Sequence, residues 1–372
     1  MSPHPRPLAG LTLSALLPLA GACDRPPEAP PAAEVTAPAA APRADLTLVF
    51  VGDVMFGRYV DSAYRPVGED PLSAIAPLLE GDVVLANLET PLVRELPEAR
   101  PEEPPNHFGA AAGWADELAD AGVTAVTLAN NHAFDQGRTG IVETPAVLEE
   151  AGVQPVGAAL AEGPALRVER LEHPDWRIGI LAATTVRNHP QGGRSQQLPF
   201  SPVDSLAERV VPVLEAARDS HDLLIVTLHW GAEYHRRPDS TQRAAAHAMI
   251  DAGADLVIGH HPHVLQGLER YGDGLIAYSL GNFVFDNVSA TPRYSGVLKV
   301  VLDGADGCLR RVTFDPVFIQ PTPEHRPVRA DPAQAEWIRS RVTRLSAELG
   351  AEWEWVEGRL VLPASDGGSR GG

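Results

Sequence analysis

The sequence predicts an α/β fold, on the evidence of two patterns that begin at Asp45. Short apolar runs alternate with amphipathic segments whose apolar residues recur at helical spacing, which is typical of strands and helices that follow one another along the chain. The apolar runs are continuous rather than alternating in polarity, as expected of parallel strands covered by helices. The predicted strands of this part are 46–51, 83–88, 123–128, 178–182, 223–228 and 256–258.

Five amphipathic segments separate these strands, and the pattern changes after residue 258. The predicted helices are 72–79, 114–121, 138–151, 203–217 and 241–252. The later runs predict antiparallel strands that extend or cover the sheet, at 264–271, 275–280, 295–302 and 308–314. One more helix is expected at 331–349, followed by a short hairpin within 352–362 and a disordered Gly/Ser tail. We therefore expect one domain over 45–320 and a C-terminal extension over 321–372.

The first 22 residues predict an export signal. Arg6 gives a positive start, residues 8–20 form an apolar stretch too short to span a bilayer comfortably, and small residues at 20–22 suit a cleavage site. The next residue, Cys23, completes a segment that resembles a bacterial lipobox. Cys23 is thus the predicted lipidation site, with ordinary secretory cleavage as the alternative. The Pro/Ala-rich residues up to 44 predict a tether, so we expect an exported protein of the cell envelope, lipid-anchored to a membrane and facing the periplasm or exterior.

Charge limits the possible partners. The chain has 30 Lys and Arg against 49 Asp and Glu, a net charge of −19. Binding to a nucleic-acid backbone or to an anionic bilayer surface depends on clustered basic residues, so we expect no nucleic acid as partner. The two cysteines, Cys23 and Cys308, provide no disulfide framework if Cys23 carries lipid.

Polar residues of metal-ligand type follow five predicted strands. They are Asp53, Glu89, the run Asn130-Asn131-His132, His229, and the run His260-His261-Pro262-His263. Open α/β sheets place ligands at this carboxyl edge, and carboxylates with imidazoles but no thiolate suit Mn, Fe, Zn or Mg. Each residue alone has a simpler structural role, such as capping a turn. Three imidazoles within four residues are harder to explain that way, so the sequence predicts one or two divalent metal ions here.

Six ordered blocks connect this prediction to a known family. They read GDVMFGR, ANLETPL, ANNHAFDQG, HWGAEY, GHHPHVLQ and SLGNFVFD. This arrangement, over roughly 45–320, resembles the CapA family of poly-γ-glutamate capsule synthesis proteins, which is similar to the calcineurin-like metallophosphoesterases. The resemblance implies a four-layer α/β/β/α sandwich of the metallo-dependent phosphatase type.

The resemblance also implies roles for individual residues. Asp53 and His263 would bind a first metal, Asn131, His229 and His261 a second, and Glu89 would bridge the two. His132 would be the catalytic acid that stabilises a leaving group. Met55 departs from the pattern, because a ligand histidine is expected two residues after the aspartate and a thioether is a poor ligand for a hard ion. The first metal is therefore in question, and Glu233 is one substitute ligand.

Two functions fit these observations. One is a metal-dependent hydrolase or transferase in which the metal activates water and His132 donates a proton. The other is a non-catalytic envelope protein that binds or guides an anionic polymer. Either would act on an envelope polymer or its precursor, with poly-γ-glutamate suspected, and could join a capsule-synthesis complex. The predicted substrate-binding residues are Arg58, Arg138, Asn130 and His260.

The net negative charge also predicts how the affinity for an anionic polymer depends on salt concentration. Long-range repulsion should slow the encounter with polyglutamate, so affinity should rise as salt screens it. A steep fall of affinity with salt would instead indicate a local basic groove.

Overall fold

The computed structural model describes residues 43–97, 106–158, 165–189, 198–286, 289–357 and 359–362. The described residues belong to one compact unit. The predicted export signal, Cys23, nearly all of the tether and the tail beyond residue 362 lie outside the described residues. Within the described ranges, no helix has both the length and the apolar character needed to cross a bilayer.

The first of two large sheets is built around the strand β1 (Leu46–Val54). This strand pairs in parallel with β2 (Val83–Leu88), and the parallel order continues through β5 (Ala125–Thr127) to β6 (Gln154–Val156). The side chains of β1 alternate between two cores, with Leu48 and Phe50 on one face and Val49 on the other. Both faces of this strand are therefore buried, which explains its continuous apolar run.

The other side of this sheet is antiparallel. There β1 pairs with β14 (Tyr294–Leu302), which pairs with β15 (Leu309–Ile319). The edge is completed by β16 (Pro327–Arg329) and by a hairpin of β17 (Glu354–Val356) and β18 (Arg359–Leu362). The C-terminal extension thus continues the first sheet.

The second sheet has a parallel centre with antiparallel edges. Its central strands are β8 (Ile178–Thr184), β9 (Leu223–His229), β10 (Leu256–His260) and β12 (Gly274–Ala277). Its edges are β7 (Glu169–Leu171) and β11 (Leu268–Tyr271). The predicted antiparallel strands at 264–271 and 275–280 correspond to β11 and β12, which pair antiparallel with each other, and β12 also runs parallel to β10. The hairpin from β11 reverses the chain without a crossover helix, and sequence patterns do not reveal such a return.

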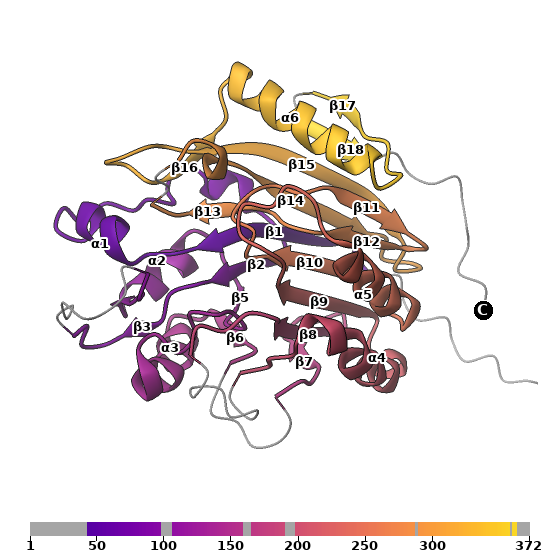
Figure 1. The fold of residues 1–372 in the computed structure, drawn as a ribbon, viewed down its shortest axis with the longest axis horizontal. Coiled ribbons are helices and arrows are strands. Elements are labelled where there is room, and N and C mark those ends of the chain that lie inside the picture. Colours follow the sequence, from indigo (N-terminus) through magenta and orange to yellow (C-terminus); the bar gives the residue numbers. More distant parts are fainter. Residues whose placement is uncertain are drawn as a thin grey trace, which may run out of the picture. The chain divides into compact units, whose positions relative to one another are not determined.

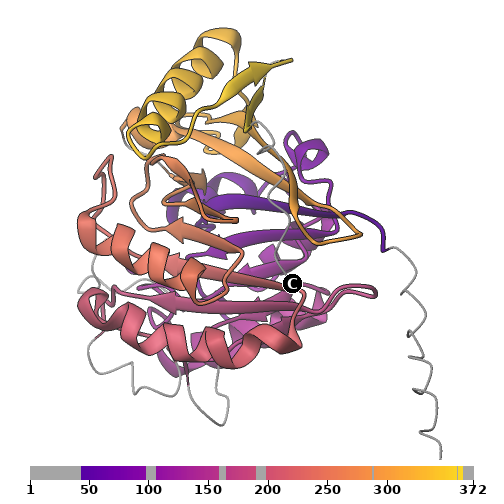
Figure 2. The same ribbon diagram turned by 90° about the vertical axis from the view of Figure 1, so that its right-hand side faces the viewer.

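Helices cover the outer face of each sheet. The helices α1 (Arg58–Tyr64), α2 (Trp114–Asp120) and α3 (Gly137–Glu150) pack on the first sheet, and α4 (Leu206–Ala217) and α5 (Ser240–Asp251) on the second. A third core lies between the sheets. Figure 1 shows α1 to α3 at the left and α4 and α5 at the right, and Figure 2 shows α4 and α5 against the second sheet. The predicted four-layer α/β/β/α sandwich is confirmed.

The last helix, α6 (Pro332–Ala347), lies outside this layering. It contacts β14 and β15 of the first sheet and β11 of the second, and it buries Ile338 and Val342 in the core between the sheets. Asp331 caps it by accepting hydrogen bonds from the backbone N–H groups of Ala333 and Gln334. The helix therefore joins the edges of the two sheets.

Some local predictions are wrong. Residues 72–79 form turns and a short 3₁₀ segment, Ala76–Leu78, instead of a helix, although Leu72 and Ile75 are buried. The segment is short, and Pro77 within it cannot donate the hydrogen bond that a helical turn requires. The helix α1 and several strands of two or three residues were not predicted, because they are too short to show a period. These strands include β3 (Leu92–Val93), β4 (Ala110–Ala111) and β13 (Asn282–Val284).

Residues 278–284 pass from the second sheet to the first. They leave β12 and enter β13, which pairs with the end of β1 at Asp53 and Asn282. Two glycines permit this close passage: a Cβ on Gly52 would lie 2.0 Å from the carbonyl oxygen of Gly281, and one on Gly259 would lie 2.0 Å from that of Tyr278. The crossing segment is therefore in backbone contact with both sheets.

We expect Gly52→Ala to lower the free energy of unfolding by about 1–3 kcal/mol, because backbone atoms must move to admit the methyl group. Urea titration followed by circular dichroism measures this change. The matched control is Gly113→Ala, at an exposed position with a φ of −59° and no atom within 4 Å of the added Cβ. Equal stability of the two variants would contradict the close contact.

Candidate metal centre

Four strand ends bring the predicted ligands together. Asp53 lies near the end of β1, Glu89 follows β2, His229 ends β9, and His261 and His263 follow β10. The five residues are at most 6% exposed. Contacts cross between the sheets here, since the backbone N–H of His261 donates to Oδ2 of Asp53 at 3.3 Å. Bulk water therefore has little access to these groups.

The ligand atoms form overlapping groups of three. Within each group the atoms lie within 4.8 Å of one another: Asp53, Glu89 and His263; Glu89, His229 and His261; and Glu233, His261 and His263. The first two groups share Glu89. A carboxylate has two oxygens and can serve two ions, so this arrangement can hold one cation or two.

Several buried polar atoms at this place lack partners among the described residues. Both carboxylate oxygens of Glu89 and the side-chain oxygen of Asn131 make no hydrogen bond there. Nε2 of His229 faces Nδ1 of His261 at 3.1 Å. Buried polar atoms are normally paired, because an unpaired one loses its hydration without compensation. A divalent cation would satisfy all of these atoms, so the residues fit a metal cofactor.

The pKa values follow from burial and from neighbouring charges. Burial and the nearby His261 imidazole hold the pKa of His229 well below its usual value, and burial with His263 lowers that of His261 to about 3. Both imidazoles are therefore neutral, the form that binds metal. Burial raises the pKa of Glu89 well above its usual value. Burial opposes charge on His263, but Glu89 and Asp53 outweigh this effect and raise its pKa to about 9.

The loop after β10 is held in an unusual conformation. His261 and His263 have φ values of 93° and 56°, in the left-handed region that non-glycine residues rarely adopt, and Pro262 separates them. The carbonyl oxygen of Pro262 accepts a hydrogen bond from the backbone of Tyr234 at 2.8 Å, and Nδ1 of His263 lies 2.7 Å from Oδ1 of Asn282. Strained backbone of this kind persists where its surroundings enforce it, and it is common at functional sites.

Asn87 orients two of the ligands, a role that sequence reasoning missed. Its amide nitrogen donates to Oδ1 of Asp53 at 2.8 Å and lies 3.3 Å from Nδ1 of His229. Its oxygen accepts from the amide of Asn130 at 3.2 Å. The register of the parallel pair sets Asn87 beside Asp53. Groups that bond to ligands in this way fix their orientation.

His132 is held by Asp135, the second residue that sequence reasoning missed. Nδ1 of His132 donates to Asp135 Oδ2 at 2.6 Å, and the Phe108 ring stacks on the imidazole with centroids 4.0 Å apart. Asp135 also accepts from the backbone of Phe108 at 2.7 Å and from His189 at 2.8 Å. Nε2 of His132 lies 3.7 Å from Oε1 of Glu89. The spacing His-x-x-Asp in one loop is the signal that indicates this pair.

The four predicted substrate-binding residues lie in different surroundings. Arg58 is partly exposed, paired with Asp286, and its guanidinium lies 4.7 Å from the centroid of the Phe108 ring, which stacks on His132. Arg138 is exposed on α3. Asn130 and His260 are enclosed by protein, at 0% and 1% exposure. The side-chain oxygen of Asn130 accepts from the backbone of His132 at 3.1 Å, so Asn130 supports the His132 loop.

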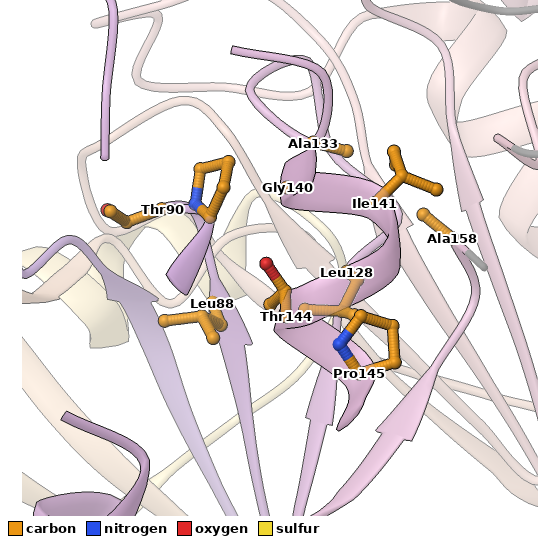
Figure 3. A pocket seen from close by; sticks show the side chains of 10 residues that line it. Leu88, Thr90, Leu128, Ala133, Gly140, Ile141, Thr144, Pro145 and Ala158 are labelled. Atoms are coloured by element: carbon orange, nitrogen blue, oxygen red, sulfur yellow. The ribbon is translucent and has the colours of Figure 1, made fainter. Parts of the chain in front are cut away.

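A small apolar cavity lies beside Leu88 and Thr90, against the first half of α3 (Figure 3). Its volume is about 10 Å³, room for one water molecule at most. Next to it Thr144 of α3 accepts from the backbone N–H of Leu92 at 2.9 Å and donates to its carbonyl at 3.2 Å. This contact ties the chain after Glu89 to the helix, and the cavity is too small for a ligand.

Comparison with known proteins identifies the family. The family model described as bacterial capsule synthesis protein PGA_cap matches residues 47–287, well over half of the chain. This chain belongs to the PGA_cap family. The predicted CapA resemblance is thereby confirmed, and all of the candidate ligands lie within the matched residues.

Two relatives in the PGA_cap family are similar over long stretches. The capsule biosynthesis protein CapA of Bacillus anthracis is 34% identical over 65% of this chain and 60% of its own length. The PGA biosynthesis protein CapA of Bacillus subtilis is 31% identical over 85% of this chain and 82% of its own length. The match thus spans less than two thirds of the B. anthracis protein.

Solved structures give a weaker likeness. A phosphatase from Mycoplasma pneumoniae aligns with a TM-score of 0.48 at 15% identity, over 76% of this chain and 96% of its own. A 5'-nucleotidase from Candida albicans aligns with a TM-score of 0.41 at 12% identity, over 84% of this chain and 61% of its own.

We expect the purified chain, reconstituted with Mn, Fe, Zn or Mg, to retain about two metal equivalents, and His261→Ala/His263→Ala to lose them. Elemental analysis after gel filtration measures the content. The control is His173→Ala/His221→Ala, which removes two histidines outside the centre. The prediction fails if no stoichiometric metal binds or if the two double variants retain the same amount.

Proposed function

We propose that this chain is a metal-dependent hydrolase or transferase that processes poly-γ-glutamate or its precursor in the cell envelope. The observation that carries the proposal is the fully buried carboxylate of Glu89, which makes no hydrogen bond to the described residues and is shared by two groups of candidate ligands. A protein that only guides a polymer needs surface charge, and a buried unpaired carboxylate would lower its stability without benefit. The name of the B. subtilis relative, PGA biosynthesis protein CapA, supports the choice of polymer, and that of the B. anthracis relative supports a role in capsule biosynthesis.

The donor set indicates which residues would hold the metal. Asp53, Glu89 and His263 would hold one ion, and Glu89, His229 and His261, together with Asn131, a second. When bound, such an ion supplies Lewis-acid polarisation of the scissile bond and activates water near neutral pH. Oxygen and imidazole donors suit manganese, iron, zinc or magnesium.

The first of these ion positions has one ligand fewer than the family resemblance implies. Met55 is fully buried and offers no imidazole. Glu233 is exposed, and one of its carboxylate oxygens lies within 4.8 Å of ligand atoms of His261 and His263. Glu233 thus lies beside one ligand of each position, His263 and His261, and we assign it as an added carboxylate ligand on the solvent side of the centre.

His132 is the group placed to move a proton. Its Nδ1 hydrogen is engaged by Asp135, so Nε2 is the atom directed at the site. Protonated on both nitrogens, with Asp135 stabilising the imidazolium, it would donate the Nε2 proton to the leaving group. Asp135 acts as a positioning residue, because its hydrogen bond fixes the tautomer and the ring orientation of His132.

Arg58 would orient an anionic substrate. Its guanidinium is partly exposed, and the ion pair with Asp286 fixes its position. Asp286 is itself buried, so it anchors the arginine without exposing a carboxylate to the substrate. A planar guanidinium recognises carboxylate and phosphoryl groups through two parallel hydrogen bonds.

We expect Asp135→Asn to lower kcat for poly-γ-glutamate cleavage about 10- to 100-fold, with KM and metal content unchanged, because His132 loses its fixed tautomer. Polymer length on gels, with kcat measured against pH, gives the readout. The control is Asp222→Asn, at a distant surface pair with Arg177. Full activity in Asp135→Asn would exclude this role. No cleavage by the metal-loaded wild-type chain would favour the non-catalytic polymer-binding alternative, which the buried Met55 supports.

We also propose that the chain is exported and lipid-anchored through Cys23, on the basis of the apolar stretch and small residues that precede it. Expressed at full length in a bacterial host, the wild type should enter the detergent phase of a Triton X-114 partition. Cys23→Ser should move to the aqueous phase, since electrostatics cannot hold a chain of net charge −19 on an anionic membrane. Cys308→Ser serves as the control. Unchanged partition of Cys23→Ser would reject the anchor.

A further inference from the structure

A cavity lined by arginines lies beside the loop that follows β9. Its volume is about 100 Å³. Its walls come from that loop, from α5 and from the C-terminal end of α6. The residues that matter for its chemistry are Arg236, Arg237, Arg243, Leu345 and Glu348.

The cavity is locally positive in a strongly acidic chain. Three arginines face one glutamate there, whereas the chain as a whole carries a net charge of −19. The buried Arg341 of α6 adds to this, with its guanidinium donating to the carbonyl of Leu265 at 2.9 and 3.1 Å. Burial, together with Arg236, Arg344 and Arg237, lowers the pKa of Arg341 to about 10. The positive charges are close enough to repel one another, so an anion would stabilise them.

One side of the cavity already holds a carboxylate. Glu348 pairs with Arg237 through two parallel contacts, Nε to Oε2 at 2.5 Å and Nη2 to Oε1 at 2.7 Å. Arg236 has no ion pair with any described residue and is exposed. Arg243 lies 3.8 Å from Glu269, and its Nε is buried without a hydrogen bond to the described residues. The Arg236 guanidinium is therefore left for a ligand, and the Nε of Arg243 lies beside it without a hydrogen bond to the described residues.

The same loop connects the cavity to the metal centre. Glu233 lies within 4.8 Å of ligand atoms of His261 and His263, and Arg237 follows four residues later, so their Cα atoms are at most roughly 14 Å apart. The loop is fixed by hydrogen bonds from Tyr234 to Pro262 and from Gln266 to His235, both at 2.8 Å. The spacing between the two sites is therefore set by the fold.

We propose that the arginine cavity is a carboxylate-binding subsite that holds the free α-carboxylates of a γ-linked polyglutamate chain whose backbone reaches the metal centre. The inference rests on the proposed function for the identity of the polymer. It adds a site built partly by α6, which lies outside residues 47–287 of the family match. It also reverses the expected effect of salt: affinity falls as salt rises, because local attraction exceeds the repulsion from the net charge.

The test measures binding without the metal. Fluorescence anisotropy of fluorescein-labelled γ-linked decaglutamate is recorded on the full chain in EDTA, at rising salt concentrations. Arg236→Gln/Arg243→Gln should weaken binding about tenfold at low salt and flatten the salt dependence. The control Arg94→Gln/Arg177→Gln removes the same charge from two surface ion pairs far from the cavity in sequence, with Glu150 and Asp222. It should bind as the wild type does.

Three results would overturn the subsite. The first is that the wild type does not bind the decaglutamate. The second is an equal loss of affinity in both double variants, which would indicate long-range charge alone. The third is that a decaglutamate with amidated carboxylates binds as tightly as the unmodified one. Equally tight binding of a glycerol-phosphate decamer would overturn the assignment to carboxylates. None of these results bears on the metal content or the cleavage assay, so failure of the subsite and failure of the proposed function are distinguishable.

Discussion

The buried carboxylate of Glu89, which makes no hydrogen bond to the described residues, is the constraint on which the rest of the site depends. A carboxylate without a hydrogen bond in a dry interior is unfavourable, and the fold keeps it there only because rigid elements surround it on every side. The strand β2 delivers it, α3 ties down the chain that follows, and the imidazoles of His132, His229 and His263 lie within 3.6 to 3.9 Å of Oε1. Stability of the metal-free chain is thus exchanged for a prearranged set of donors.

The two sheets supply different halves of this donor set, so their relative position determines the site. The first sheet gives carboxylate and amide oxygens, and the second gives imidazoles. The glycine contacts at Gly52 and Gly259 bring the crossing segment against both sheets at backbone distance. Asn87 then joins Asp53 to His229. A shift of one sheet relative to the other would separate these partners, which explains why small residues and amides are found at the junction.

Sequence reasoning predicted the strands and the clustering of the candidate ligands for the same physical reason. Strands covered on both faces produce continuous apolar runs, and β2 was therefore predicted at its observed bounds. Polar residues that follow such parallel strands meet at one edge of the sheet. Short edge strands have too few residues to show a period, and the direction of β12 depends on a hairpin. Asn87 could not be assigned a role, because its bonds depend on strand register, whereas the His-x-x-Asp spacing of His132 and Asp135 was present in the sequence but not used. The lipid anchor and the roles of the ligands stay predictions.

The left-handed conformations of His261 and His263 have a consequence for the choice of ion. Side chains on an ordinary flexible loop can move to follow a larger or smaller cation. These two imidazoles project from backbone that has few alternatives, with Pro262 between them and with hydrogen bonds to Asp53 and Asn282. A rigid cage of this kind discriminates among cations by radius and preferred coordination geometry. The loop cannot move to fit a different ion, so an ion of the wrong size binds with lower affinity.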